Sequence, residues 1–103
     1  MARKTLKQRI GIDIGRRVSV EEGIEWAATH DVDIIDVQTD IHPNALESFD
    51  DARIEGITQA LDKHGIQLGL HTLSGVNIAE FSPFCRDAVD NYLKAYILSL
   101  IHI

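Results

Sequence analysis

Four polar side chains stand in or at the end of short apolar segments, where they could contact a bound molecule. Asp13 lies in IGIDIG, Asp36 and Gln38 lie in DIIDVQ, and His71 ends IQLGLH. Each segment alternates in hydrophobicity and is rich in branched aliphatic residues, which is typical of a β-strand. Carboxylate, amide and imidazole groups that meet in one place can bind a polar substrate.

Helical patterns follow each of these strand-like segments. The expected helix starts are marked by cap-like pairs: Ser19 with Glu22, Ser48 with Asp51, and Ser82 with Pro83. Gly23 weakens the first helix somewhat, and Lys63, His64 and Gly65 end the second one. The resulting order of strand, helix, strand, helix, strand, helix predicts a parallel sheet with right-handed crossovers.

The third expected helix carries a long apolar stripe. Because Cys85 lies on this stripe, we expect the thiol to be part of the core rather than a reactive group. It is the only cysteine, so an internal disulfide is excluded. The stripe consists of Cys85, Val89, Tyr92, Leu93, Tyr96, Ile97 and Leu100.

The two faces of the expected strands differ. One face is aliphatic throughout: Ile12, Ile14, Ile35, Val37, Leu68 and Leu70. The other face becomes polar towards the strand ends, through Asp13, Asp36, Gln38 and His71. A doubly wound sheet needs two apolar faces, whereas a barrel packs helices only outside and can have a polar lumen at its C-terminal rim. The sequence therefore favours an α/β fold that comprises the first three βα units of a TIM (β/α)8 barrel, with parallel strands and helices on the outer face.

On that interpretation the four polar side chains share one mouth, rimmed by loops that contain His42, Ser74 and Asn77. Simpler alternatives stay open. His71 could bond to backbone at the strand end, and the two aspartates could accept hydrogen bonds from nearby loop amides.

Charge and hydropathy restrict the classes of partner. The chain has 10 basic and 16 acidic residues, and four of the basic ones fall in residues 1–9, which hold no acid. The remainder carries six basic and sixteen acidic residues, a formal charge of −10, so nucleic acid is a disfavoured partner. Neither a membrane span nor the apolar core of a secretory signal is evident, and a cytoplasmic location is expected.

The segment LGLHTLSGVNIAEFSPFCRDAVDNYLKAYI resembles the third strand, loop and third helix of xylose-isomerase-like barrels. This superfamily includes sugar phosphate isomerases and epimerases and the apurinic endonucleases. The histidine at the strand end, the loop asparagine and the Ser-Pro pair match His71, Asn77 and Ser82-Pro83. IGIDIG and ARIEGITQALDKHGIQLGLH fit the earlier units. The expected domain is residues 10–97, after a solvated basic end at 1–9.

The resemblance implies metal-assisted proton transfer next to a sugar carbonyl. In such enzymes two glutamates, an aspartate and a histidine from later strands hold a divalent metal, and Mn, Mg or Zn would suit the site. The implied partner is a small sugar or sugar phosphate. The implied substrate-binding residues here are His71, Asn77, Gln38, Asp13 and Asp36. In the alternative, an apurinic endonuclease-like hydrolase, His71 would bind metal.

A complete barrel needs about 250 residues, whereas this chain has 103. The terminal LSLIHI departs from the expected pattern, so residues 98–103 are interpreted as a non-native tail of a truncated reading frame. The main metal ligands would then be missing, and the chain alone is expected to be inactive. A third possibility is a small α/β binding module that self-associates through its two exposed sheet edges.

Overall fold

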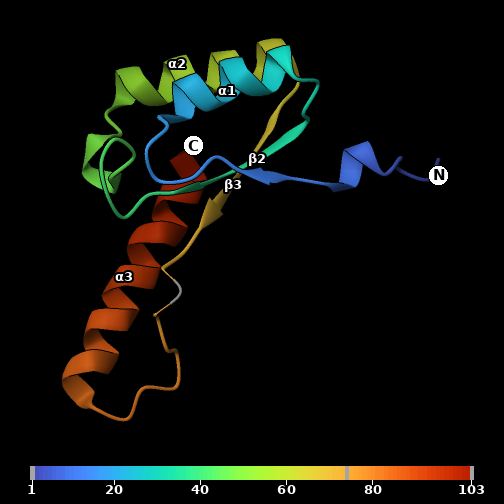
Figure 1. The fold of residues 1–103 in the computed structure, drawn as a ribbon. Helices are drawn as coiled ribbons and strands as arrows, with labels where there is room; N and C mark the ends of the chain where they lie inside the picture. Colours follow the sequence, from blue (N-terminus) through green and yellow to red (C-terminus); the bar gives the residue numbers. More distant parts are fainter. Residues whose placement is uncertain (1, 74, 103) are drawn as a thin grey trace.

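Three parallel strands form the centre of the molecule, in the order β1–β2–β3 (Figure 1). The computed structural model describes residues 2–73 and 75–102, so Ser74 and Ile103 lie outside the described residues. The strands are β1 (Ile12–Asp13), β2 (Ile34–Gln38) and β3 (Gln67–His71). The helices are α1 (Val20–Thr29), α2 (Asp51–His64) and α3 (Pro83–His102), and two 3-10 turns are η1 (Lys7–Arg9) and η2 (Leu46–Ser48). The predicted alternation of strands and helices in a parallel sheet is confirmed.

The register of the strands places the polar positions in rows. Asp13 of β1 is the neighbour of Asp36 in β2, and Asp36 is the neighbour of Gly69 in β3. Two residues further along each strand, Gln38 of β2 is the neighbour of His71 in β3. Because side chains on neighbouring parallel strands point to the same face when their Cα atoms pair, the polar residues share one face of the sheet.

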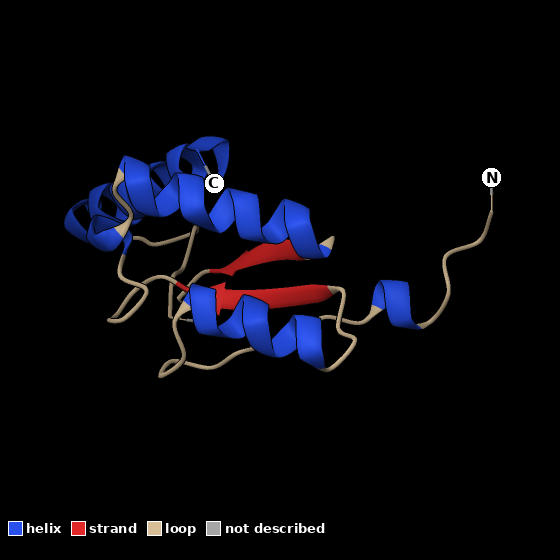
Figure 2. Cartoon of the chain, turned by 90° about the horizontal axis from the view of Figure 1, so that it is seen from above, coloured by secondary structure: helices blue, strands red, loops and turns tan. Residues whose placement is uncertain are grey.

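Helices α1 and α2 lie side by side over the other face (Figure 2). Ile35 and Val37 of β2 are completely buried beneath them, together with Ile24 of α1 and Ile57 of α2. This aliphatic layer is the core of the molecule, and its burial is the main driving force for the fold. The predicted distribution of aliphatic residues towards the helices is therefore confirmed for these two helices.

Local sequence explains how α1 reaches the sheet. Ser19 caps the helix: its hydroxyl accepts from the Glu22 amide at 3.2 Å, and the Glu22 carboxylate accepts from the Ser19 amide at 3.1 Å. Gly23 is buried, and a Cβ atom there would lie 2.8 Å from Ile14 Cδ1. The cost of glycine in a helix is thus offset by a closer approach of α1 to the first strand.

The N-cap of helix α2 lies two residues after the predicted cap. Asp50, not Ser48, is the N-cap, and its carboxylate accepts from the Arg53 amide at 2.8 Å. Ser48 instead closes η2, where its hydroxyl donates to the carbonyl of Ala45 at 2.6 Å. The predicted end is confirmed, because Gly65 follows the helix with a φ of 65°, in the left-handed region that favours glycine.

Helix α3 begins at Pro83 as predicted but leaves the layer formed by α1 and α2. It lies on the opposite side of the strands, near their C-terminal ends (Figures 1 and 2). Tyr96 is buried, whereas Cys85 is exposed and Ile97 is 59% exposed. The prediction of a core cysteine is therefore wrong, and the expectation that all helices share the outer face fails for α3. Within residues 2–73 and 75–102, no helix combines the length and the apolar character that crossing a membrane requires.

The basic end at residues 1–9 is exposed along its described part, as expected. One of its residues still contacts the body of the protein: Lys7 Nζ lies 2.6 Å from Asp31 Oδ1 and 3.3 Å from Asp33 Oδ1. These carboxylates belong to the turn between α1 and β2. Because all three groups face water, the pairs fix the direction of the N-terminal segment more than they stabilise the fold.

A polar network joins the loops at the C-terminal ends of β1 and β2. Asn44 is 1% exposed; its amide nitrogen donates to Val18 O at 2.8 Å, and its oxygen accepts from Val20 N at 2.9 Å. Arg53 adds a two-pronged contact with Glu21, at 2.7 and 2.9 Å, and a bond to the carbonyl of Pro43 at 3.1 Å. The start of α1, the loop after β2 and the start of α2 are thereby held together.

Replacement of Asn44 by alanine is expected to lower the free energy of unfolding by about 1–3 kcal/mol, because it leaves buried backbone groups without partners. Urea denaturation followed by circular dichroism measures the change. Asn91→Ala, at an exposed position of α3, is the control and should change the stability by less than about 0.5 kcal/mol. Equal effects of the two substitutions would contradict this role of Asn44.

The Glu21–Arg53 pair makes stability depend on pH. The Arg53 guanidinium lowers the pKa of Glu21 below its ordinary value of 4.5, so the folded chain binds fewer protons than the unfolded chain near that pH. The contribution is complete above pH 4.5 and is lost as pH falls through the lower folded-state value. Because Glu21 is 47% exposed, we expect Glu21→Gln to cost only about 0.2–1 kcal/mol at pH 7.

Urea denaturation from pH 7 down to pH 3 tests this linkage. The difference between the wild-type chain and Glu21→Gln should shrink as pH falls below 4.5. Glu47→Gln, on the exposed side of η2, should give a small difference that does not follow this course. A Glu21→Gln difference that stays constant, or grows, towards pH 3 would argue against the pair.

Candidate functional site

Three side chains from three different strands meet on the face of the sheet that α1 and α2 leave uncovered. Asp13, Asp36 and His71 each offer one potential ligand atom, and these atoms all lie within 4.8 Å of one another. The parallel register described above brings them together, although up to 58 positions separate them in the chain. This cluster, called the Asp-Asp-His cluster below, is the candidate functional site.

A direct hydrogen bond joins two members of the cluster. His71 Nδ1 lies 3.0 Å from Asp36 Oδ2, and both side chains remain partly open to solvent, at 41% and 33%. A carboxylate accepts only, so in neutral histidine the proton belongs on Nδ1. This leaves the Nε2 lone pair of His71 free to accept a proton or to bind a metal ion.

The glycine at the centre of β3 makes room for this arrangement. A Cβ atom at Gly69 would lie 3.1 Å from Asp36 Oδ1. A side chain at this position would therefore require the Asp36 carboxylate, whose other oxygen bonds to His71, to move by a few tenths of an ångström. The sequence shows that Gly69 shares the polar face, but only the register reveals which carboxylate occupies the space above it.

Asp13 uses one of its oxygens locally. Its Oδ1 accepts from the Gly15 amide at 2.7 Å, and Gly15 has a φ of 77°, which favours glycine. This is the loop-amide bond that the sequence left open as an alternative for the aspartates. The bond also fixes the orientation of the carboxylate, whose second oxygen can still accept a hydrogen bond or contact a cation.

Gln38 is bonded to a residue that the sequence reasoning did not identify. Its Oε1 accepts from Arg16 Nε at 3.0 Å. Arg16 lies in the loop after β1, and both side chains are near the C-terminal rim of the sheet. The signal that could have found it is its place directly after a strand end, where functional loops of such folds lie. The contact adds an exposed guanidinium, a good phosphate ligand, to the rim.

The loop after β3 contributes less than expected. Asn77 is exposed, and its side-chain oxygen accepts from the Ala79 amide of the same loop at 3.0 Å. Among the described residues, the hydrogen-bond partner of the Asn77 side chain lies in its own loop and not in the Asp-Asp-His cluster, so its substrate role stays a prediction. His42 is exposed on the loop after β2, and Ser74, the other predicted rim residue, lies outside the described residues.

Helix α3 contacts the C-terminal rim of the sheet through Tyr92. Tyr92 donates its hydroxyl proton to Asp40 Oδ1 at 2.8 Å and accepts from the Leu73 amide at 2.7 Å. Burial raises the pKa of Tyr92 well above its ordinary value, so the phenol stays protonated and can donate. The sequence predicted Tyr92 and Tyr96 only as packing residues, because the partners of Tyr92 lie 52 and 19 positions away in the chain.

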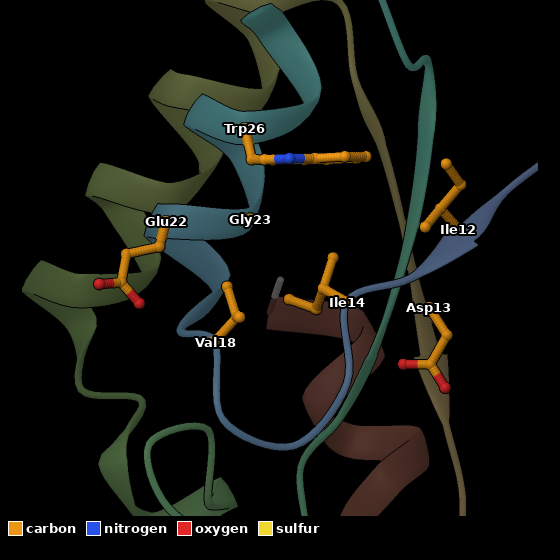
Figure 3. Close-up of a pocket in the computed structure, with 7 residues that line it drawn as sticks. All are labelled: Ile12, Asp13, Ile14, Val18, Glu22, Gly23 and Trp26. Atoms are coloured by element: carbon orange, nitrogen blue, oxygen red, sulfur yellow. The ribbon is translucent and has the colours of Figure 1, made fainter. Parts of the chain in front are cut away.

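A separate pocket of about 460 Å³ opens along the free edge of β1 (Figure 3). Asp13 is the one residue that it shares with the Asp-Asp-His cluster. Its walls are mostly aliphatic and aromatic, so it does not provide the polar contacts that a sugar requires. The lining residues are Ile12, Asp13, Ile14, Val18, Glu22, Gly23 and Trp26.

The donor set of the Asp-Asp-His cluster fits a divalent cation as well as a polar substrate. Two carboxylates and one imidazole are ligands that Mn and Zn accept. The ligand atoms all lie within 4.8 Å of one another, and opposite ligands of such an ion are roughly 4 Å apart. The same groups can bind hydroxyl groups, because both carboxylates are acceptors and His71 Nε2 can accept as well.

No protein-family model, no curated protein and no solved structure matches this chain. The geometry of the Asp-Asp-His cluster and the chemistry of its side chains are therefore what indicates a function. Of the five predicted site residues, the structure brings Asp13, Asp36 and His71 together, places Gln38 beside Arg16, and leaves Asn77 within its own loop.

Asp36 is expected to fix the tautomer of His71. In the wild-type chain at pH 8.5, the neutral imidazole should carry its proton on Nδ1, because Asp36 accepts from this nitrogen. Asp36→Ala removes the acceptor and should move the population towards the Nε2–H form. Long-range 1H–15N correlation spectra of the histidine side chains distinguish the two forms directly.

Two further variants sharpen this experiment. Gly69→Ala should produce a smaller shift in the same direction, because it moves the Asp36 carboxylate by a few tenths of an ångström without removing it. Asp33→Asn, outside the cluster, is the control and should leave the His71 signals unchanged. If His71 favours Nε2–H already in the wild-type chain, the Asp36 bond does not set its tautomer.

Proposed function

We propose that this chain forms the first three βα units of a xylose-isomerase-like barrel and supplies substrate contacts to a sugar or sugar phosphate isomerase or epimerase. The observation that carries the proposal is the convergence of Asp13, Asp36 and His71 on the sheet face that α1 and α2 leave open. That face corresponds to the lumen of a barrel, and the strand ends correspond to its functional rim.

The chemistry of the three groups suits a polyhydroxylated substrate. The carboxylates of Asp13 and Asp36 can accept hydrogen bonds from neighbouring hydroxyl groups, and His71 Nε2 can accept a proton or orient a hydroxyl. A divalent metal, when bound, would polarise the substrate carbonyl. Arg16 at the rim offers a guanidinium to a phosphate group. The formal charge of −10 on residues 10–103 favours such a small substrate over DNA.

The position of α3 adds a requirement to the proposal. In a barrel this helix would pack outside the sheet, next to α2. Here it lies on the opposite side, where the Tyr92–Asp40 bond holds it at the rim. If further βα units completed a barrel, they would therefore have to displace α3 from the C-terminal end of the barrel. A doubly wound fold would also place a helix on the side of the sheet that α3 now occupies. The position of α3 in a longer form of the chain would therefore distinguish a barrel from a doubly wound fold.

Binding of a sugar phosphate should involve the three cluster residues together. We expect xylulose 5-phosphate at millimolar concentration to shift the amide signals around His71 and Asp36 in 1H–15N spectra of the 103-residue chain. His71→Asn should weaken this binding at least about threefold, because it removes the lone pair at Nε2. Arg16→Gln should weaken binding of the phosphate more than binding of xylulose.

His42→Asn, on the neighbouring exposed loop, is the matched control and should bind like the wild-type chain. No proton exchange into the sugar from D2O is expected, because the metal ligands of this superfamily come from later strands. Absence of any binding at the cluster, or proton exchange that the isolated chain catalyses, would contradict the proposal. A longer form of the chain would offer a second test: its later strands should end in Glu, Asp, His and Glu.

A further inference from the structure

The pocket along the free edge of β1 is an apolar groove that nothing in the described chain fills. Ile12 and Trp26, two of its lining residues, are 37% and 42% exposed. Gly23 adds no side chain to it, and Ile14 and Val18 form its inner part (Figure 3). Contiguous apolar surface of this kind usually marks a place where another surface binds.

The side chains best suited to fill such a groove lie at the other end of the molecule. Phe81 is 91% exposed, Phe84 is 89% exposed and Ile78 is 80% exposed, the highest values among the large apolar side chains described. They belong to the loop before α3 and its first turn, which lie at the end of α3 furthest from α1 (Figure 1). In this arrangement they cannot reach the groove of their own chain.

We propose that a second copy of this chain inserts Phe81 and Phe84 into the groove between β1 and α1, and that the first copy does the same in return. The exchange of two identical contacts closes the assembly as a twofold dimer. It follows from the exposed surfaces of this chain alone, so it does not depend on the proposed sugar chemistry.

Size and area are compatible with this contact. An apolar cavity of about 150 Å³ holds one benzene ring in another protein, so a groove of about 460 Å³ has room for two phenyl rings. Four phenylalanines that each bury about 150–250 Å² contribute about 600–1,000 Å², which approaches the roughly 1,000 Å² that a specific interface needs.

The charges beside the two surfaces are mixed. Arg86 is exposed and donates to the carbonyl of Phe81 at 3.3 Å, so its guanidinium accompanies the two phenyl rings. The Glu80 carboxylate accepts from the Phe81 amide of the same loop at 3.0 Å. Asp13 and Glu22 are among the residues that line the groove, so Arg86 is the group of the loop whose charge complements them.

The composition of the chain provides an unusually direct test. Its only tryptophan, Trp26, lines the groove, and its only cysteine, Cys85, directly follows Phe84. Wild-type chain serves as the fluorescence donor, and Trp26→Phe chain labelled at Cys85 with an aedans group serves as the acceptor. In reducing buffer, the mixture should show energy transfer from Trp26 that increases with the acceptor concentration.

The double variant Phe81→Ser, Phe84→Ser in the acceptor chain should weaken this association at least about tenfold. Leu98→Ser, at a position of α3 that is 57% exposed, is the matched control and should behave like the parent acceptor. All three positions are exposed, so the circular dichroism spectra should stay unchanged.

Sedimentation velocity on the unlabelled chains completes the experiment. The wild-type chain should form a dimer that the double variant does not form. A wild-type chain that stays monomeric at several hundred micromolar would overturn the proposal. A dimer without energy transfer would overturn it too, because the copies would then meet elsewhere, for example along the open edge of β3.

Discussion

The parallel register of three short strands is the constraint on which the candidate site depends. It sets Asp13 beside Asp36, and Asp36 beside Gly69, in one row across the sheet. The row holds because Ile35 and Val37 of β2 are buried under α1 and α2, which fixes the opposite face as the polar one. A shift of one residue would bury the carboxylates and expose the core aliphatics. The hydrophobic core and the polar cluster are thus two results of the same alignment.

The sequence predicted this part of the fold well for a physical reason. Alternation along a strand decides which face is buried, and a helix placed between two strands forces them to be parallel. Both properties are local, so the elements as far as His71 could be inferred without coordinates. The convergence of Asp13, Asp36 and His71 followed from them, because strand ends in a parallel sheet meet at one edge.

Contacts between distant loops could not be inferred in this way. Asn44 and Arg53 have no periodic pattern around them, yet they join the starts of both outer helices. Helix α3 shows the same limitation. Its stripe predicted that Cys85 would be buried, but the stripe does not specify which surface it will cover. The bonds of Tyr92 to Asp40 and Leu73 place the helix at the rim and leave Cys85 in solvent.

The absent side chain of Gly69 has an evolutionary consequence. Because a Cβ atom there would lie 3.1 Å from Asp36 Oδ1, a side chain at position 69 requires the carboxylate to move by a few tenths of an ångström. Descendant chains that gain a side chain at position 69 are therefore expected to change position 36 more often than chains that keep the glycine. Two neighbours on adjacent strands are thereby expected to covary, and the pattern of substitutions at this pair would record whether selection has maintained the histidine's partner.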